Sequence, residues 1–325
     1  MLYKLPLPSN STVQLYRPKL IEARMTNSQP SVTLNTSLTL RNQTFEWGSQ
    51  TYLMGILNVT PDSFSDGGQF NTLESALKQA QHMATSGAHI LDVGGQSTRP
   101  QAEDISLETE LQRVVPVIEA IRSSSDPVLQ AIPISVDTTK AEVAKAAVLA
   151  GADLVNDISG ATFDPAMLPT VAELGVPIVL MHIRGTPKTM QQHTNYQDLI
   201  GELVHFLAQR VEAAIAAGIA PNQILLDPGI GFAKTFTQNL EILQQLPQLR
   251  SLGFPLLVGT SRKSFIGHIL NQPDPKQRVW GTAATCCAAI AGGADVLRVH
   301  DVPEMRDVCR VTDAIWRSHG PSIAP

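Results

Sequence analysis

The chain has 325 residues, 43% of them hydrophobic, and a formal net charge of −5 at pH 7; this length suits two ordinary domains or one barrel of about 250 residues with an extension. The charge gives no general attraction for nucleic acid, and no apolar run reaches the roughly 18 residues of a membrane span. Three cysteines, two of them adjacent, make neither a disulfide framework nor a spaced zinc site, so we expect a cytoplasmic protein in a reducing compartment.

The first 29 residues predict a disordered tail. They are rich in Ser, Asn and Pro, show no periodicity and contain Glu22 as their only acid. A translation start at Met25 and a transit peptide both stay open as alternatives. We expect residues 30–325 to form a single domain.

The rest of the chain shows a repeating pattern. Residues 32–50 alternate apolar and polar positions, which predicts a β-hairpin. From residue 52 onward, short apolar runs alternate with longer segments of helical periodicity, as is typical of parallel strands joined by crossover helices. The predicted strands are 53–58, 89–94, 132–137, 153–156, 178–182, 224–227, 256–259 and 296–300. The predicted helices are 73–86, 107–123, 140–150, 165–174, 196–217, 237–246, 281–291 and 302–316.

Eight strand–helix units predict a closed (β/α)8 TIM barrel, with the short N-terminal hairpin over its floor. Several predicted helices end at a glycine that can cap the last turn, and these glycines are Gly87, Gly151, Gly175, Gly218 and Gly293. The alternative is an open doubly wound sheet. It has less support, because no G-x-G-x-x-G follows the first predicted strand and no G-x-x-x-x-G-K-[ST] occurs.

Polar residues recur where the predicted strands end. They are Asn58, Asp92, Asp137, Asn156, His182, Asp227 and His300. In a TIM barrel the carboxyl ends of the strands share one rim, where active sites of this fold are built, so we expect one polar pocket. Any one Asp or Asn can instead cap a helix or form a turn. We interpret Asp92 as structural and leave His182 outside the catalytic set.

Two long loops and two cationic clusters also follow predicted strands. The loops at 58–70 and 94–100 are polar and rich in turn residues, which is typical of lids over a site, although plain flexibility explains them equally. The clusters are "SRKS" at 261–264 and "RVH" at 298–300. Because the whole chain is acidic, we expect these local cations to hold any anionic ligand.

Several of these segments resemble a known family. "MGILNVTPDSFSDGG" (54–68) and "LDVGGQSTRP" (91–100) are similar to the first and second signatures of dihydropteroate synthases. Further matching segments follow in the family's order: "ISVDTTK" (134–140), "NDISG" (156–160), "LMH" (180–182), "LLDPGIGFAK" (225–234), "GTSRKSFIG" (259–267) and "RVHDV" (298–302). The resemblance spans the chain from about residue 52 to the C-terminal helix and implies a pterin-binding TIM barrel.

The sequence departs from the family pattern at three positions. Gln96 stands where a glutamate is more familiar, Ala233 replaces a usual glycine, and Gln101 replaces another. The first two changes can alter loop or turn geometry. None removes a group that the implied chemistry needs.

The resemblance implies a transferase of folate biosynthesis. Its reaction joins para-aminobenzoate to the methylene carbon of 6-hydroxymethyl-7,8-dihydropterin pyrophosphate and gives 7,8-dihydropteroate and pyrophosphate with Mg²⁺. The family further implies a homodimer formed through helices late in the barrel, with residues 281–293 as a candidate face, and sensitivity to sulfonamides. We expect no nucleic-acid or membrane partner.

The resemblance also assigns roles to residues of this chain. The implied pterin set is Asp137, Asn156, Ile158, Met181, Asp227, Phe232 and Lys263. The implied pyrophosphate set is Asn58, Thr98, Arg99, Arg298 and His300, with Asn58 as the Mg²⁺ ligand. The implied para-aminobenzoate set is Phe64, Thr98, Pro100, Phe232 and Ser264. The implied catalytic residues are Asp137, Lys263, Arg298 and His300.

The implied chemistry suits these residue types. A pterin edge presents N–H donors beside a carbonyl, which a carboxylate, an amide and a cation can match. Two rival functions stay open: a pterin-dependent methyltransferase on a similar barrel, and a pterin-binding module without turnover. A methyltransferase does not explain the cations Arg298 and His300, and release of pyrophosphate separates all three functions.

Overall fold

The computed structural model describes residues 37–60, 69–98 and 104–317. Of the predicted site residues, Phe64, Arg99 and Pro100 lie outside these ranges, as do the predicted tail at 1–29 and Gln101. The domain boundary at residue 30 therefore stays a prediction.

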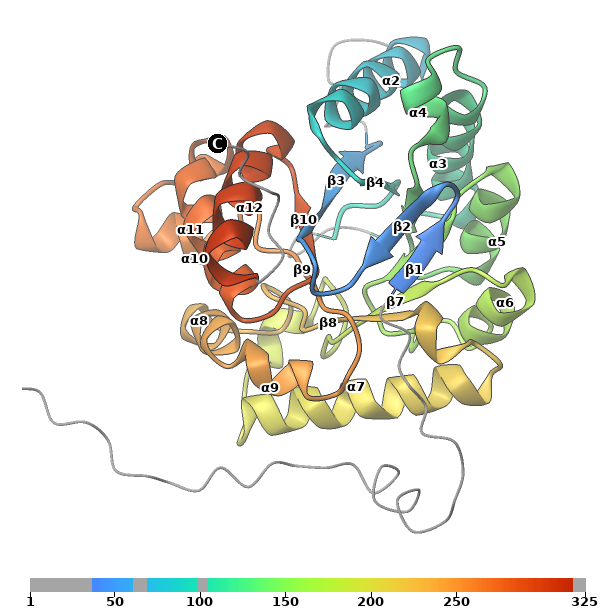
Figure 1. Cartoon of the computed structure of the whole chain (residues 1–325). Coiled ribbons are helices and arrows are strands. Elements are labelled where there is room, and N and C mark those ends of the chain that lie inside the picture. Colours follow the sequence, from blue (N-terminus) through green and yellow to red (C-terminus); the bar gives the residue numbers. More distant parts are fainter. Residues whose placement is uncertain (1–36, 61–68, 99–103, 318–325) are drawn as a thin grey trace, which may run out of the picture. The chain divides into compact units, whose positions relative to one another are not determined.

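Eight parallel strands form a closed barrel (Figure 1). In chain order they are β3 (Tyr52–Asn58), β4 (Ile90–Gly94), β5 (Ile134–Asp137), β6 (Leu154–Asp157), β7 (Ile178–Met181), β8 (Ile224–Asp227), β9 (Leu257–Val258) and β10 (Val296–Val299). Their order in the sheet is β8-β7-β6-β5-β4-β3-β10-β9. A parallel bridge between Leu226 and Leu256 joins the two ends of this sheet, so the predicted TIM barrel is confirmed.

Helices alternate with the strands and cover the outside of the barrel. They are α2 (Gln69–Ser86), α3 (Leu107–Arg122), α4 (Pro127–Ala131), α5 (Ala141–Ala150), α6 (Met167–Leu174), α7 (Leu199–Ala216), α8 (Phe236–Gln244), α9 (Leu246–Arg250), α10 (Ser264–Ile269), α11 (Val279–Ala291) and α12 (Val302–Trp316), with 3-10 turns at Met190–Gln192, Pro221–Gln223 and Pro275–Gln277. The glycines predicted as caps are left-handed; Gly151 and Gly175 have φ of 117° and 67° at the ends of α5 and α6.

Local capping explains where several helices differ from prediction. α7 begins three residues later than predicted because Asp198 accepts a hydrogen bond from the Gly201 amide at its N-terminus. α8 begins one residue earlier, directly after Thr235, which forms a capping box with Gln238. Helix α4 was not predicted. It begins at a proline capped by Asp126, and five residues are too few to show a helical period.

The predicted hairpin is also present. Its strands β1 (Ser37–Leu40) and β2 (Gln43–Glu46) pair with Leu38 opposite Phe45. Phe45 is fully buried, and its ring centroid lies 4.8 Å from that of Tyr52 at the start of β3. The hairpin and the first residues of the barrel strands form one apolar cluster. This cluster closes the amino-terminal end of the barrel and leaves the opposite rim for a site.

A second, larger apolar core lies between the sheet and the surrounding helices. Strand residues such as Leu91, Ile134 and Leu226 point outward into it and are fully buried. The barrel strands are therefore apolar on both faces, apart from the polar residues at their carboxyl ends. Among the described residues, no helix is both long and apolar enough to cross a bilayer.

Candidate active site

Arg298 joins side chains from three other strands at the carboxyl rim of the barrel. It lies on β10, and its Nε donates to Asp92 Oδ2 on β4 at 2.6 Å. Its Nη2 donates to Asp137 Oδ2 on β5 at 2.6 Å, and Asn156 Nδ2 on β6 donates to Asp92 Oδ2 at 3.2 Å. Arg298 and Asp92 are 206 positions apart in sequence, so barrel closure is what brings these charges together.

The charges in this cluster are tuned by burial. The pKa of Asp137 is raised to about 7: burial is the largest cause, Arg298 opposes it, and the nearby Asp92 carboxylate adds to the rise. Burial disfavours the Arg298 cation, yet Asp92 and Asp137 together raise its pKa above the ordinary value. Arg298 therefore stays charged, whereas the Asp137 carboxyl changes its protonation state close to pH 7. Within the described residues, Asp92 Oδ1 has no hydrogen-bond partner, which leaves one buried acceptor in the cluster.

Asp227 and Lys263 form the second polar group of the rim. Burial raises the pKa of Asp227 to about 6, against the hydrogen bond from the Gly229 amide at 2.7 Å and the charge of Lys263. Burial also lowers the pKa of Lys263 to about 8. The Lys263 Nζ lies 4.3 Å from the centroid of the Phe232 ring. Lys263 passes so close to Gly231 that a Cβ there would lie 2.9 Å from Lys263 Cδ.

An apolar wall adjoins these charges. A small buried cluster, separate from both cores, contains Ile158, Met181, Ile183, Met190, Phe232 and Ala233. Ile158 follows β6 and Met181 ends β7, so two of these side chains come directly from the rim. The structure therefore brings the three apolar residues of the predicted pterin set into one cluster beside the strand carrying Asp227.

The remaining predicted residues lie around this centre. His300 follows β10, and its Nδ1 lies 2.9 Å from the Ser261 hydroxyl, which also accepts from the His300 amide at 3.1 Å. Asn58 ends β3 opposite Gly94, Thr98 is half-buried beyond β4, and Ser264 is the exposed first residue of α10. These side chains lie on segments of the rim. The hydrogen bonds of the Arg298 cluster connect other residues, namely the acids and the amide on β4, β5 and β6.

Three residues of this region were given no role in the predicted site. Asp92, interpreted as structural, lies in the centre of the polar cluster as the partner of both Arg298 and Asn156. Lys234 and His182 are buried next to the Asp227 segment, with Lys234 Nζ 3.1 Å from His182 Nδ1. The only signal in the sequence was position: Asp92 and His182 lie at strand ends, and Lys234 closes the "LLDPGIGFAK" segment.

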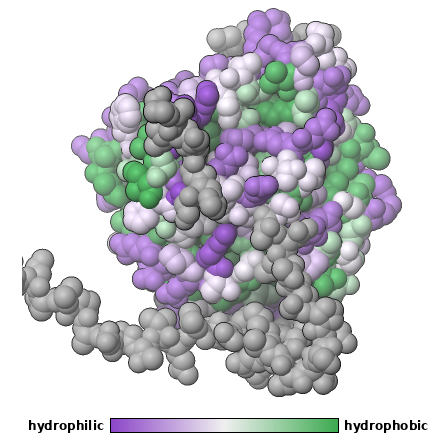
Figure 2. Space-filling view, viewed as in Figure 1, coloured by the Kyte–Doolittle hydropathy of each residue, from purple (hydrophilic) through white to green (hydrophobic). Residues whose placement is uncertain are grey.

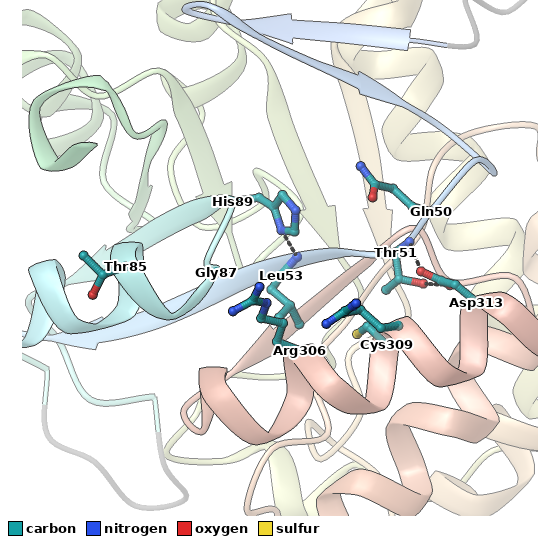
Figure 3. Close-up of a pocket in the computed structure, with 10 residues that line it drawn as sticks. Gln50, Thr51, Leu53, Thr85, Gly87, His89, Arg306, Cys309 and Asp313 are labelled. Carbon is teal, nitrogen blue, oxygen red and sulfur yellow. Dashed lines mark hydrogen bonds between the residues drawn. The ribbon is translucent and has the colours of Figure 1, made fainter. Parts of the chain in front are cut away.

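A cavity of about 380 Å³ lies elsewhere, between the start of β3, the end of α2 and helix α12 (Figure 3). His89, Arg306 and Cys309 line it, and the Thr51 amide and hydroxyl donate to Asp313 at 2.7 and 2.6 Å. Because it sits where strands begin, it is separate from the carboxyl rim. We do not assign the reaction to it.

Comparisons with known proteins identify the family of the chain. A family model described as "Pterin binding enzyme" matches residues 54–300, which run from β3 to the residue after β10. A dihydropteroate synthase of Synechocystis sp. is 63% identical over 273 residues, covering 84% of this chain and 93% of its own length.

Solved structures give the same result. The Yersinia pestis dihydropteroate synthase with a sulfonamide drug complex has a TM-score of 0.79 at 45% identity, covering 86% of this chain and 98% of its own. The Xanthomonas albilineans dihydropteroate synthase with 4-aminobenzoic acid has a TM-score of 0.79 at 41% identity, covering 89% and 99%. With this similarity over most of its length, the chain belongs to the dihydropteroate synthases, a family of pterin-binding enzymes.

Proposed function

We propose that the carboxyl rim joins para-aminobenzoate to 6-hydroxymethyl-7,8-dihydropterin pyrophosphate, releasing pyrophosphate and 7,8-dihydropteroate. As a dihydropteroate synthase, the chain is a transferase. The observation that carries the assignment is the set of buried acids, a buried amide and half-buried cations at one rim, where Arg298 contacts both Asp92 and Asp137. A diphosphate leaving group and a flat polar heterocycle require this combination of charges.

Recognition of the pterin is the first task of the site. The Asp227 carboxylate accepts from the N–H groups of the pterin edge, the Asn156 amide can both donate and accept there, and the Lys263 cation donates to an acceptor of the ring. The apolar cluster with Ile158, Met181 and Phe232 packs against the ring face. A ligand without the matching N–H groups leaves buried acceptors unpaired, which disfavours its binding.

Cleavage of the carbon–oxygen bond is the second task. As pyrophosphate leaves with the bonding electrons, the methylene carbon becomes positive and shares its charge with the dihydropterin ring. Asp137, in its charged form, stabilises this developing cation in a site that excludes water. Arg298 and His300 bind the departing anion. Because Arg298 spans Asp92 and Asp137, its guanidinium is already oriented before the substrate arrives.

Mg²⁺ is proposed as the cofactor. The Asn58 carboxamide at the end of β3 is an oxygen donor of the kind Mg²⁺ prefers. Among the described residues no three His, Cys, Asp or Glu side chains come together as a metal site. This fits a cation that takes its other ligands from water and substrate phosphates. When bound, Mg²⁺ would neutralise charge on the diphosphate.

The amine substrate completes the reaction. The Phe232 ring gives an apolar contact, and Ser264 with the first amides of α10 offers donors to a carboxylate; Thr98 lies on the neighbouring loop. Phe64, Arg99 and Pro100 keep their predicted roles here. The aniline nitrogen is uncharged at neutral pH, so it forms the new carbon–nitrogen bond and then releases a proton without a strong general base. Sulfonamides, which share this shape, are proposed inhibitors.

A homodimer in the cytoplasm is the proposed assembly and location. Large apolar side chains are exposed on α11 and α12, namely Trp280, Val311, Ile315 and Trp316. The two helices pack against each other, and Figure 2 shows hydrophobic surface over this region of the molecule. Exposed apolar patches of this kind mark protein interfaces. The proposed location is a reducing compartment, in which the free Cys286, Cys287 and Cys309 stay reduced.

Pyrophosphate release tests the proposal. The protein is mixed with the dihydropterin pyrophosphate and para-aminobenzoate, with and without Mg²⁺, and pyrophosphate is measured by a coupled assay. We expect Mg²⁺-dependent release that requires both substrates. Pterin binding without pyrophosphate release would instead identify a methyltransferase or a silent binding module.

A further inference from the structure

We propose that Lys234 is a positioning residue for pterin recognition: its buried ammonium holds the segment after β8 in the form that directs Asp227 and Phe232 to the ligand. The inference rests on the proposed function, because it concerns the same pocket. Lys234 lies seven residues after Asp227, and its side chain turns back beneath the segment between them.

All three N–H groups of Lys234 are used by the protein. The side chain is 2% exposed, and its Nζ contacts His182 Nδ1 at 3.1 Å, the Gly229 carbonyl at 3.0 Å and the Phe232 carbonyl at 2.9 Å. An ammonium has three donors and no acceptor. No donor remains for a ligand, so Lys234 acts through its neighbours rather than on the substrate.

Gly229 connects Lys234 to the pterin carboxylate. Its amide donates to Asp227 Oδ1 at 2.7 Å, while its carbonyl accepts from Lys234 Nζ and from the Phe232 amide, each at 3.0 Å. The residue has a φ of +70°, and a Cβ on it would overlap the carbonyl oxygen of His182. Gly229 therefore orients the Asp227 carboxylate through its amide and is itself held by Lys234 through its carbonyl.

The Phe232 carbonyl is the second connection. Its hydrogen bond to Lys234 holds the Phe232 backbone, and the Phe232 ring lies under the Lys263 ammonium. The backbone here is unusual, since Ala233 has a φ of 51° in the left-handed region. A conformation of this kind costs about 1 kcal/mol for a residue with a side chain, so it persists because other contacts, including those of Lys234, stabilise it.

The charge of Lys234 also favours the ionised form of Asp227. Burial lowers the pKa of Lys234 itself to about 7, so its charge is present on the acidic side of neutrality, where Asp227 titrates. Burial raises the pKa of Asp227, and three cations lower it, in the order Lys263, Arg298 and Lys234. His182 adds no competing charge, because burial, with Lys234 and Arg184, lowers its pKa to about 2. Removing the Lys234 charge should therefore raise the pH at which Asp227 protonates and pterin binding fails.

Two substitutions separate the charge of Lys234 from its hydrogen bonds. Lys234→Gln keeps donors for the carbonyls without the charge, and Lys234→Met removes both. The probe is 6-hydroxymethylpterin, whose affinity is measured by calorimetry from pH 5 to 8. We expect the acidic loss of binding to move up by about one pH unit in both variants. The affinity at pH 7 should fall about tenfold or more in Lys234→Met and less in Lys234→Gln.

Arg122→Met is the matched control. Arg122 is a half-buried cation that, like Lys234, donates to backbone carbonyls, those of Gln130, Ile132 and Gly151, and it pairs with Asp153 near the barrel floor. It should lower thermal stability without moving the pH midpoint of binding. If the wild type binds the pterin but both Lys234 variants keep its affinity and pH midpoint, this inference is wrong while the proposed function stands. A wild type that binds no pterin would instead overturn the proposed function; if Lys234→Met does not fold, Lys234→Gln decides.

Discussion

Gln96 uses both halves of its amide to join two loops of the rim. Its Nε2 donates to Asp104 Oδ1 at 3.0 Å, and its Oε1 accepts from Lys140 Nζ at 3.0 Å. A glutamate, the more familiar residue at this position of the family signature, would keep the contact with Lys140 but place a second carboxylate against Asp104. The glutamine at position 96 is therefore matched by Asp104, which accepts a hydrogen bond that a glutamate could not donate.

Exchanging the hydrogen-bond donor at Gln96 and the acceptor at Asp104 tests this pairing. Gln96→Glu is expected to lower the free energy of unfolding by about 1 kcal/mol, because two carboxylates then face each other. Adding Asp104→Asn should restore the loss, since an asparagine amide donates to a glutamate. Asp104→Asn alone is the control and should be nearly neutral. Thermal unfolding of the four proteins measures the effect, and failure of the second change to rescue the first would contradict the pairing.

Asp92 adds to the rise in the pKa of Asp137, of which burial is the largest cause, and it orients Arg298. Four groups act on the buried Asp137 carboxyl: Arg298 lowers its pKa, whereas Asp92, Glu110 and Asp157 raise it. In Asp92→Asn, the amide oxygen can still accept from Arg298, and the new NH₂ occupies the place of the unpartnered Oδ1. The geometry is kept while one negative charge is lost.

The pH dependence of kcat/KM should respond to this change. In the wild type we expect an acidic limb near pH 7, where the carboxylate of Asp137 becomes protonated as the pH falls. Removing the Asp92 charge favours the ionised form of Asp137, so the limb should move to lower pH in Asp92→Asn. A limb that stays in place or moves to higher pH would show that Asp92 does not act on Asp137 in this way.

The hairpin packs onto the barrel floor through the buried side chain of Phe45. Phe45 is fully buried between Tyr52 and Trp47, with ring centroids 4.8 and 5.9 Å away. Phe45→Ala should lower the free energy of unfolding by about 3–5 kcal/mol, because it leaves a cavity at the barrel floor. Thr44→Ala, at the exposed neighbouring position, is the control. Urea unfolding measures both, and a loss in Phe45→Ala no larger than in the control would show that the hairpin does not close the floor.

Elements were predictable where their pattern was long or their ends were marked. β8 and α12 match the predicted ranges at both ends, since polar or turn residues mark both ends of each apolar pattern. β5 begins at Ile134 instead of 132, because Ile132 and Pro133 end the short helix α4. α9 was missed for the same reason as α4: its five residues show no period.

The whole barrel was predictable because its unit repeats, and the site was predictable only in part. Closure of eight strands puts every strand end on one rim, so the polar set could be collected without coordinates. Which of those side chains touch depends on the register of the sheet. Arg298 and Asp92 lie on strands that both neighbour β3, as closure of the predicted barrel requires, but the sequence does not show that their side chains meet across β3. The buried Lys234 was missed because its partners are mostly backbone carbonyls, which leave no sequence signal.

Assembly is the remaining property of the whole molecule, and the surface of α11 and α12 predicts it. Trp280 is 77% exposed and Ile315 is 68% exposed, although both are large and apolar. We expect light scattering to give twice the chain mass of 35.0 kDa at micromolar concentration. Trp280→Glu with Ile315→Glu should give a monomer, because the new charges would be buried in the interface. Leu149→Glu, on α5 at 75% exposure, is the matched control and should stay dimeric. A dimer that survives the double substitution would show that the interface lies on another face. A monomeric wild type would show that no second copy covers these side chains.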